Sequence, residues 1–239
     1  DVPRVEAEGR SFVYSTIPLG ILFNDEAIVT VTLNESPIIN DFIKGRVKSF
    51  YTFKKTRFIL QLLYKNATRF LMYLKQIDKA STAVQNELHK SMKNKELIQL
   101  LSLEKSLVYF STSLTSNEMV LDKMMKLGYI KKYQDDVDLL EDVIVENKQA
   151  IEMCNIYRDI LSGTMDAFAS VISNNLNIVM KMLTAITIII SIPTLIASIW
   201  GMNVPLPLSG NRYGFWIILG VSAGLSAIIA YIMKKKKML

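Results

Sequence analysis

Polar residues recur on one helical face through the most apolar part of the chain, from Asp166 towards Asn203. The steps between them alternate between four and three residues and average about 3.5, which places them along one seam of a gently supercoiled helix. The seam comprises Asp166, Ser170, Ser173, Asn177, Met180, Thr184, Thr187, Ser191, Thr194 and Ser198. The intervening residues of 182–200 are apolar apart from Pro193. Such a face predicts a water-lined path. The alternative is that the Ser and Thr hydroxyls lie at helix–helix contacts or bond to their own backbone.

The first 40 residues alternate weakly and are rich in β-branched and aromatic side chains. Two runs, Ser11–Ile17 and Ala27–Leu33, are typical of strands, and Pro18, Gly20 and Pro37 mark turns beside them. We expect two or three strands of an α/β domain whose remaining strands precede Asp1, because a lone hairpin is marginally stable in water.

Helical periodicity dominates from Phe58 to Leu127. Polar breaks at 92–95 and 112–117 predict two or three antiparallel helices. Gly128 is expected to end this region, and no breaker stronger than Gly163 follows before Pro193, so one helix is predicted over 131–200. A helix of that length, on the order of 100 Å, fits a stalk that packs against copies of itself better than part of one compact domain. At Pro193 a mild kink is expected.

Charge and hydropathy indicate that part of the chain spans a membrane. The chain has 239 residues, of which 50% are hydrophobic, and no charged residue lies between Lys181 and Arg212 or between Arg212 and Lys234. Each uncharged stretch can cross a hydrocarbon core, which takes about 20 helical residues. We therefore predict transmembrane helices at 182–201 and 214–233, with Gly220 and Gly224 permitting close approach of the second span to another helix.

The distribution of basic residues predicts the topology. Four lysines follow the second span, whereas the loop between the spans carries only Arg212, so both termini are expected in the cytosol and the loop outside. We therefore attribute the net charge of +6 to membrane topology rather than to nucleic-acid binding. The lone Cys154 allows no intrachain disulfide, which fits a cytosolic bulk. Because the chain opens at Asp1 without a signal-like segment, we expect that its natural start is missing.

Gly201-Met202-Asn203 directly follows the first predicted span and precedes a short loop and one more span. With Ile196–Trp200, Met180–Thr184 and the terminal lysines, this arrangement resembles the CorA family of magnesium transport proteins, closely from Tyr157 to Leu239 and elsewhere only in architecture. The resemblance implies a homopentamer in which the first spans line a central pore, the second spans form an outer ring and the cytosolic domains form a funnel.

The resemblance also implies roles for individual residues. Gly201, Met202 and Asn203 would form the selectivity filter, with Asn203 meeting the hydrated ion at the outer mouth. Asp166 and Asn177 match polar positions of the cytosolic pore, and Met180 and Leu183 match its apolar constriction. Amide and carbonyl oxygens suit Mg²⁺, which keeps several of its waters.

Two further groups of residues have regulatory or structural interpretations. Family members close when acidic sites between subunits fill with Mg²⁺, which makes Asp142, with Asp138 and Glu141, a candidate sensor; the alternative is a solvated helix start. The resemblance implies that the basic tail forms a collar around the cytosolic pore; the alternative is a topology signal and lipid contact only. It consists of Lys234, Lys235, Lys236 and Lys237. The outer loop, unlike that of many relatives, contains no Asp or Glu, so it should concentrate cations less well.

The expected fold is an α+β membrane protein that is mostly α. Its predicted parts are a truncated cytosolic α/β and helical domain (1–128), a stalk (129–181), two spans (182–201 and 214–233) joined by an outer loop (202–213), and a tail (234–239). The predicted function is a Mg²⁺ channel in the plasma membrane, gated by cytosolic Mg²⁺. Alternatives are a zinc, cobalt or nickel transporter of the same fold, as in the ZntB branch, or a membrane-anchored helical scaffold. An enzyme has no support, since no phosphate loop, catalytic triad or transition-metal spacing is present.

Overall fold

The computed structural model describes residues 1–8, 11–91, 94–126, 133–203 and 211–236. These form two compact units, Asp1–Asp166 and Ala167–Leu239, which are described separately. The boundary falls inside the stalk predicted over 129–181. Gly128, most of the outer loop (204–210) and Lys237 lie outside the described residues.

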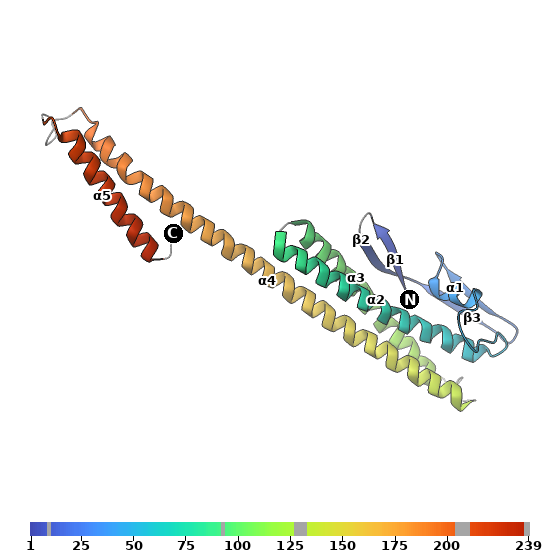
Figure 1. Cartoon of the computed structure of the whole chain (residues 1–239). Coiled ribbons are helices and arrows are strands. Elements are labelled where there is room, and N and C mark those ends of the chain that lie inside the picture. The colour runs from blue at the N-terminus through green and yellow to red at the C-terminus, as the bar shows by residue number, and fades with distance from the viewer. Residues whose placement is uncertain (9–10, 92–93, 127–132, 204–210, 237–239) are drawn as a thin grey trace. The chain divides into compact units, whose positions relative to one another are not determined.

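The first unit contains two antiparallel hairpins (Figure 1). Strand β1 (Val2–Glu8) pairs with β2 (Ser11–Ile17), and β3 (Leu19–Phe23) pairs with β4 (Ile28–Thr32). The first hairpin packs on the helices behind it through the buried side chains of Val2 and Tyr14. The hairpin is therefore stabilised by tertiary contact with helices, as a two-stranded ribbon requires.

A short helix, α1 (Pro37–Ile43), follows the strands. Pro37 occupies the start of this helix rather than the turn that the sequence predicted, because proline's fixed φ and missing N–H are tolerated in a first helical turn. The buried Ile38 and Phe42 of α1 join a small core with Val2 and Leu62.

Two long helices, α2 (Lys55–Ser91) and α3 (Asn94–Lys126), form an antiparallel hairpin that is the body of the first unit. The predicted break at 112–117 is wrong, since α3 continues through it. The hydroxyls of Thr112, Thr115 and Ser116 donate to the carbonyls of Val108, Ser111 and Thr112, so this polar stretch is satisfied within the helix.

Helix α4 (Gln134–Trp200) contains 67 residues and passes through Gly163 and Pro193 without a break. Its first part packs on α2 and α3, where Leu140 and Val143 share a core with Leu60 and Leu121. Two buried polar contacts fix the register of α4 on α3. Asn147 Nδ2 donates to the Leu114 carbonyl at 3.2 Å, and Cys154 Sγ donates to the Leu107 carbonyl at 3.1 Å. Burial raises the pKa of the Cys154 thiol to about 11, so it stays protonated at neutral pH.

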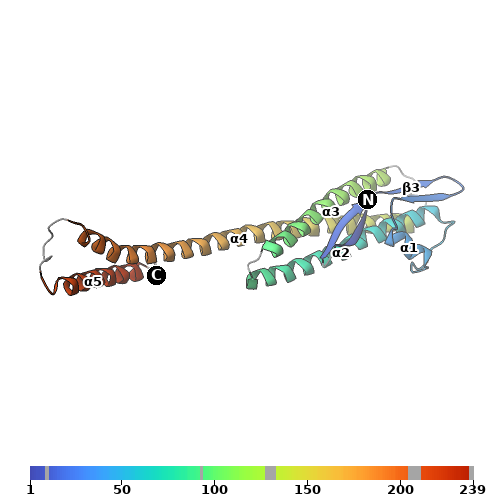
Figure 2. The same ribbon diagram turned by 90° about the horizontal axis from the view of Figure 1, so that it is seen from above.

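Helix α5 (Gly214–Lys235) lies beside the last part of α4 in the second unit, as Figures 1 and 2 both show. Both α4 and α5 are long and apolar enough to cross a membrane by length and composition. A Cβ atom placed at Gly220 or Gly224 would meet nothing within 4 Å, so this glycine pair packs against nothing that the structure describes. The expected α+β class, mostly helical with a long stalk and a C-terminal apolar helix, is confirmed.

An aromatic cluster dominates the core of the first unit. Phe110 is fully buried and makes edge-to-face contacts with Tyr14 and Phe70, with ring centroids 6.3 and 5.0 Å away. Phe110→Ala should lower the free energy of unfolding by about 3–5 kcal/mol, because it removes a buried ring and leaves a cavity. Urea unfolding of the purified protein measures this change. The neighbouring Val108→Ala, at an exposed position, should change stability by less than about 0.5 kcal/mol, and equal losses would contradict this account of the core.

Candidate functional site

The polar seam lies on an exposed face of α4. Every member from Asp166 to Ser198 is exposed in the single chain, as are the apolar Met180 (51% exposed) and Leu183 (55%). An apolar helix whose exposed face carries hydroxyl groups needs either water or another copy of the helix there.

Four hydroxyl groups of the seam donate to their own backbone. Thr184 Oγ1 donates to the Met180 carbonyl at 2.8 Å, and Thr187 Oγ1 donates to the Leu183 carbonyl at 2.9 Å. Ser191 Oγ and Thr194 Oγ1 repeat the pattern one turn further on, at 2.7 and 3.0 Å. This is the local bonding that the sequence left open as an alternative to a water path.

A seam hydroxyl that donates to its own backbone can still accept a hydrogen bond from the water shell of an ion. A hydroxyl oxygen has two lone pairs in addition to its single O–H donor. With the proton held by the i−4 carbonyl, the oxygen of Thr187 or Ser191 presents only acceptor sites outward. A row of acceptors suits water molecules whose own oxygens face a cation, because those waters direct their hydrogens outward.

Seam hydroxyls and apolar side chains together form a hollow of about 640 Å³ on α4. Thr187, Ser191, Thr194 and Ser198 line one part of it, and the remaining lining residues are Leu183, Ile186, Ile190 and Leu195. The mixed lining leaves acceptor oxygens beside a largely apolar wall.

The predicted filter begins where α4 ends. The Gly201 N–H donates to the Ala197 carbonyl at 2.9 Å, and the Met202 N–H donates to the Ile199 carbonyl at 3.3 Å, so the chain turns tightly out of the helix. A Cβ atom at Gly201 would lie 3.2 Å from the Ala197 carbonyl oxygen, which leaves little room for a larger residue. Asn203 and Met202 (57% exposed) are accessible just beyond this turn.

The acidic residues at the start of α4 do not converge on one point. Asp136 is buried and pairs with Arg57 of α2 at 3.4 Å, and Asp138 accepts a hydrogen bond from Gln134 at 2.7 Å. Glu141 and Asp142 are exposed, and no three acidic, His or Cys side chains in the described part of the chain could hold a metal together. The structural role of Asp136 could not be read from the sequence, because its partner Arg57 lies 79 residues away.

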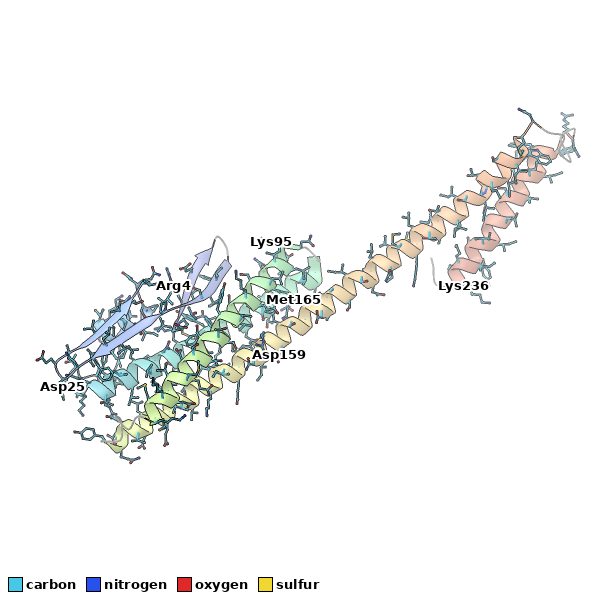
Figure 3. All side chains as sticks on the ribbon, turned by 180° about the vertical axis from the view of Figure 1, so that it is seen from behind. Arg4, Asp25, Lys95, Asp159, Met165 and Lys236 are labelled. Carbon is cyan, nitrogen blue, oxygen red and sulfur yellow. The ribbon has the colours of Figure 1, made fainter. Side chains whose placement is uncertain are left out.

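Lys234 and Lys235 form the last turn of α5, and Lys236 caps the helix. All three are exposed, and Figure 3 labels Lys236 at this helix end. Their charges stabilise the negative end of the helix dipole, so the tail has a local role independent of a collar.

Comparison with known proteins decides the family. The family model described as CorA-like Mg²⁺ transporter protein matches residues 2–235. The chain belongs to this family. The expected CorA relationship is thereby confirmed, and the family consists of divalent-cation transporters of the membrane rather than enzymes.

Individual CorA relatives support the same assignment. The cobalt/magnesium transport protein CorA of Methanocaldococcus jannaschii is 27% identical over 98% of this chain and 79% of its own length. The protein of the same name from Thermotoga maritima is 28% identical over 71% of this chain, and the match spans about half (49%) of that protein. The complete structure of the CorA magnesium transporter from M. jannaschii superposes with a TM-score of 0.74 at 26% identity, covering 98% of this chain and 78% of that one.

Proposed function

We propose that this CorA-family chain forms a Mg²⁺ channel, in which a largely hydrated ion passes along the seam of α4 and enters at Asn203. The main observation in support is that Gly201-Met202-Asn203 is exposed at the end of a helix face that bears regularly spaced acceptor oxygens. The relatives named as cobalt/magnesium transporters support the ion class. Oxygen ligands and retained waters favour Mg²⁺ over softer metals, for which the chain offers one His and one Cys.

A conducting path requires several copies of the chain, because one helix encloses no pore. We propose a homopentamer with α4 helices around the axis and α5 helices outside. The exposed seam and the unpartnered glycine pair of α5 support this arrangement, since both surfaces are available for contact with water or with other helices. Asp166, Ser170, Ser173 and Asn177 would then form the polar cytosolic pore, and Met180 and Leu183 the apolar constriction.

The proposed topology places both termini in the cytosol of a plasma-membrane protein. Lys234 and Lys235 at the end of α5 support it, because positive residues beside a span favour the cytosolic side. The exposed lysines would contact lipid headgroups or form a collar around the pore.

Gating by cytosolic Mg²⁺ is proposed to involve Asp142, with Asp138 and Glu141. Asp142 is exposed beside these residues, and a partner carboxylate from a neighbouring subunit would complete an oxygen site. Asp142→Asn should raise the Mg²⁺ concentration needed for half-closure by about fivefold or more. The substitution removes a carboxylate ligand and with it the coupling between Mg²⁺ binding and closure, which is typically at least about fivefold in affinity. Glu152→Gln, a change at an exposed carboxylate further along α4, is the control. Equal closing concentrations in wild type and Asp142→Asn, measured by flux at graded internal Mg²⁺, would place the sensor elsewhere.

The experiment that tests the proposed function is Mg²⁺ influx into proteoliposomes that contain the purified protein. Influx down a Mg²⁺ gradient supports the channel. Preference for Zn²⁺ would favour the transporter alternative, and correctly inserted protein without any ion flux would favour a scaffold.

A further inference from the structure

A basic pocket lies in the first unit, at the end where α2 and α4 begin. Its volume is about 430 Å³, and it is lined by the segment after α1, by one face of α2 and by Leu139 of α4. The lining residues are Arg46, Val47, Lys48, Arg57, Gln61, Tyr64, Lys65 and Leu139. No carboxylate belongs to this lining, whereas four cations do. Such a concentration of one sign costs repulsion unless an anion offsets it.

The four cations differ in how far they are already neutralised. Arg57 Nη1 pairs with Asp136 at 3.4 Å and with Asp135 at 3.7 Å, and Arg46 Nη1 pairs with Asp41 at 3.3 Å. These are long contacts for charge-assisted bonds, which are usually about 2.7–2.9 Å. Lys48 and Lys65 have no ion pair within the described part of the chain. The pocket therefore retains the positive charge of at least these two lysines.

The segment that carries Arg46 and Lys48 is held in a defined conformation. Gly45 and Ser49 have positive φ angles of 65° and 57°, and for serine this conformation is uncommon. The Arg46 N–H donates to the Asp41 carbonyl at 2.9 Å, and Gln61 Nε2 of α2 lies 3.4 Å from the Ser49 carbonyl. The segment is thereby bonded to α1 at one end and to α2 at the other. A backbone held in a rarely used conformation is often found at binding sites.

We propose that this pocket binds a polyphosphate anion, such as the triphosphate group of a nucleotide. Arg and Lys are the side chains that recognise phosphate, and Arg46 and Arg57 can each offer a planar pair of donors while the lysines act as point charges. The volume is in the range of small-molecule sites, about 300–1,000 Å³. Tyr64, Val47 and Leu139 add an apolar wall that can contact an organic part of the ligand.

Occupancy would connect three elements of the first unit. The ligand would join the segment after α1, α2 through Arg57 and Lys65, and the start of α4 at Leu139. Arg57 already joins α2 to the first turn of α4 through Asp136, so an anion there competes with that carboxylate for the guanidinium. Occupancy would therefore act on the packing of the first part of α4 against α2.

Binding to the full chain in detergent solution tests the proposal, with ATP and inorganic triphosphate as probes in Mg²⁺-free buffer containing EDTA. Lys48→Gln and Lys65→Gln should each weaken binding by about tenfold, because each removes one charge-assisted contact. These positions are chosen because Arg57 supports the buried Asp136 and its loss would disturb folding. Lys75→Gln with Lys79→Gln, at exposed positions on α2 outside the pocket, is the matched control and should bind as wild type does.

The outcomes distinguish a specific binding site from nonspecific electrostatic attraction of anions. Equal affinity for both probes supports recognition of the phosphate chain alone, and tighter binding of ATP supports an additional contact of the base with the apolar wall. Absence of saturable binding at millimolar concentrations would overturn the proposal, as would equal weakening in the control pair or equal affinity for orthophosphate. Unchanged circular dichroism and gel-filtration profiles show that the variants remain folded.

Discussion

Replacing Asn203 with alanine is expected to abolish Mg²⁺ uptake while leaving assembly intact. In the proposed pentamer one substitution removes five amides at the mouth, and each hydrogen bond to the hydrated ion contributes roughly 1 kcal/mol. A loss on the order of 5 kcal/mol would slow entry about a thousandfold or more, since each 1.4 kcal/mol is a factor of ten in rate. Uptake in cells with a Mg²⁺-sensitive dye measures the effect.

Assembly should survive this change, because Asn203 is exposed beyond the end of α4. Asn175→Ala, an exposed asparagine of α4 that lies off the seam, serves as the matched control and should transport normally. If the Asn203 variant assembles and still takes up Mg²⁺ at the wild-type rate, the ion does not enter through this residue.

Replacing the hydroxyls in the middle of the seam is expected to have the second-largest effect. Thr187→Val with Ser191→Ala keeps helix propensity and volume nearly unchanged but removes acceptor oxygens at two successive turns of α4. Because those oxygens are proposed to accept hydrogens from the ion's waters, flux should fall by at least about tenfold. Measurement in proteoliposomes separates flux from expression.

The control moves the substitution one residue around the helix. Ile188→Val with Ile192→Val alters side chains of the same span without touching the seam, and its flux should match wild type. An equal loss in both pairs would mean that packing, rather than the acceptor row, explains the effect. Wild-type flux in the hydroxyl-free pair would assign the seam hydroxyls to backbone bonding alone, as the 2.7–3.0 Å contacts to the i−4 carbonyls permit.

Long periodic segments of this fold were predictable from sequence, and short elements were not. The run from 131 to 192 contains no breaker stronger than Gly163, and α4 extends from Gln134 through Pro193 to Trp200. Strand β1 was missed because Val2–Glu8 mixes charged and apolar residues and is held by pairing with β2. Helix α1 was missed because Pro37 was interpreted as a turn residue rather than a helix start.

The same contrast applies to the candidate site. The seam is a local property of one helix, so spacing alone placed its members on one exposed face. Contacts between residues far apart in the sequence could not be predicted in this way. Arg57 with Asp136, and the convergence of Lys48, Lys65 and Leu139, depend on the packing of α2 against α4. The hydroxyl back-bonds to i−4 carbonyls are geometric details that sequence permits but does not require.

The central claim is that Mg²⁺ passes along α4 and enters at Asn203. Its most direct test is the initial rate of Mg²⁺ influx into proteoliposomes carrying wild-type or Asn203→Ala protein, with Co²⁺, Ni²⁺ and Zn²⁺ as competitors. The account predicts rapid wild-type influx down the gradient and almost none through the variant. Equal influx through both proteins, or wild-type vesicles that admit Zn²⁺ in preference to Mg²⁺, would contradict it.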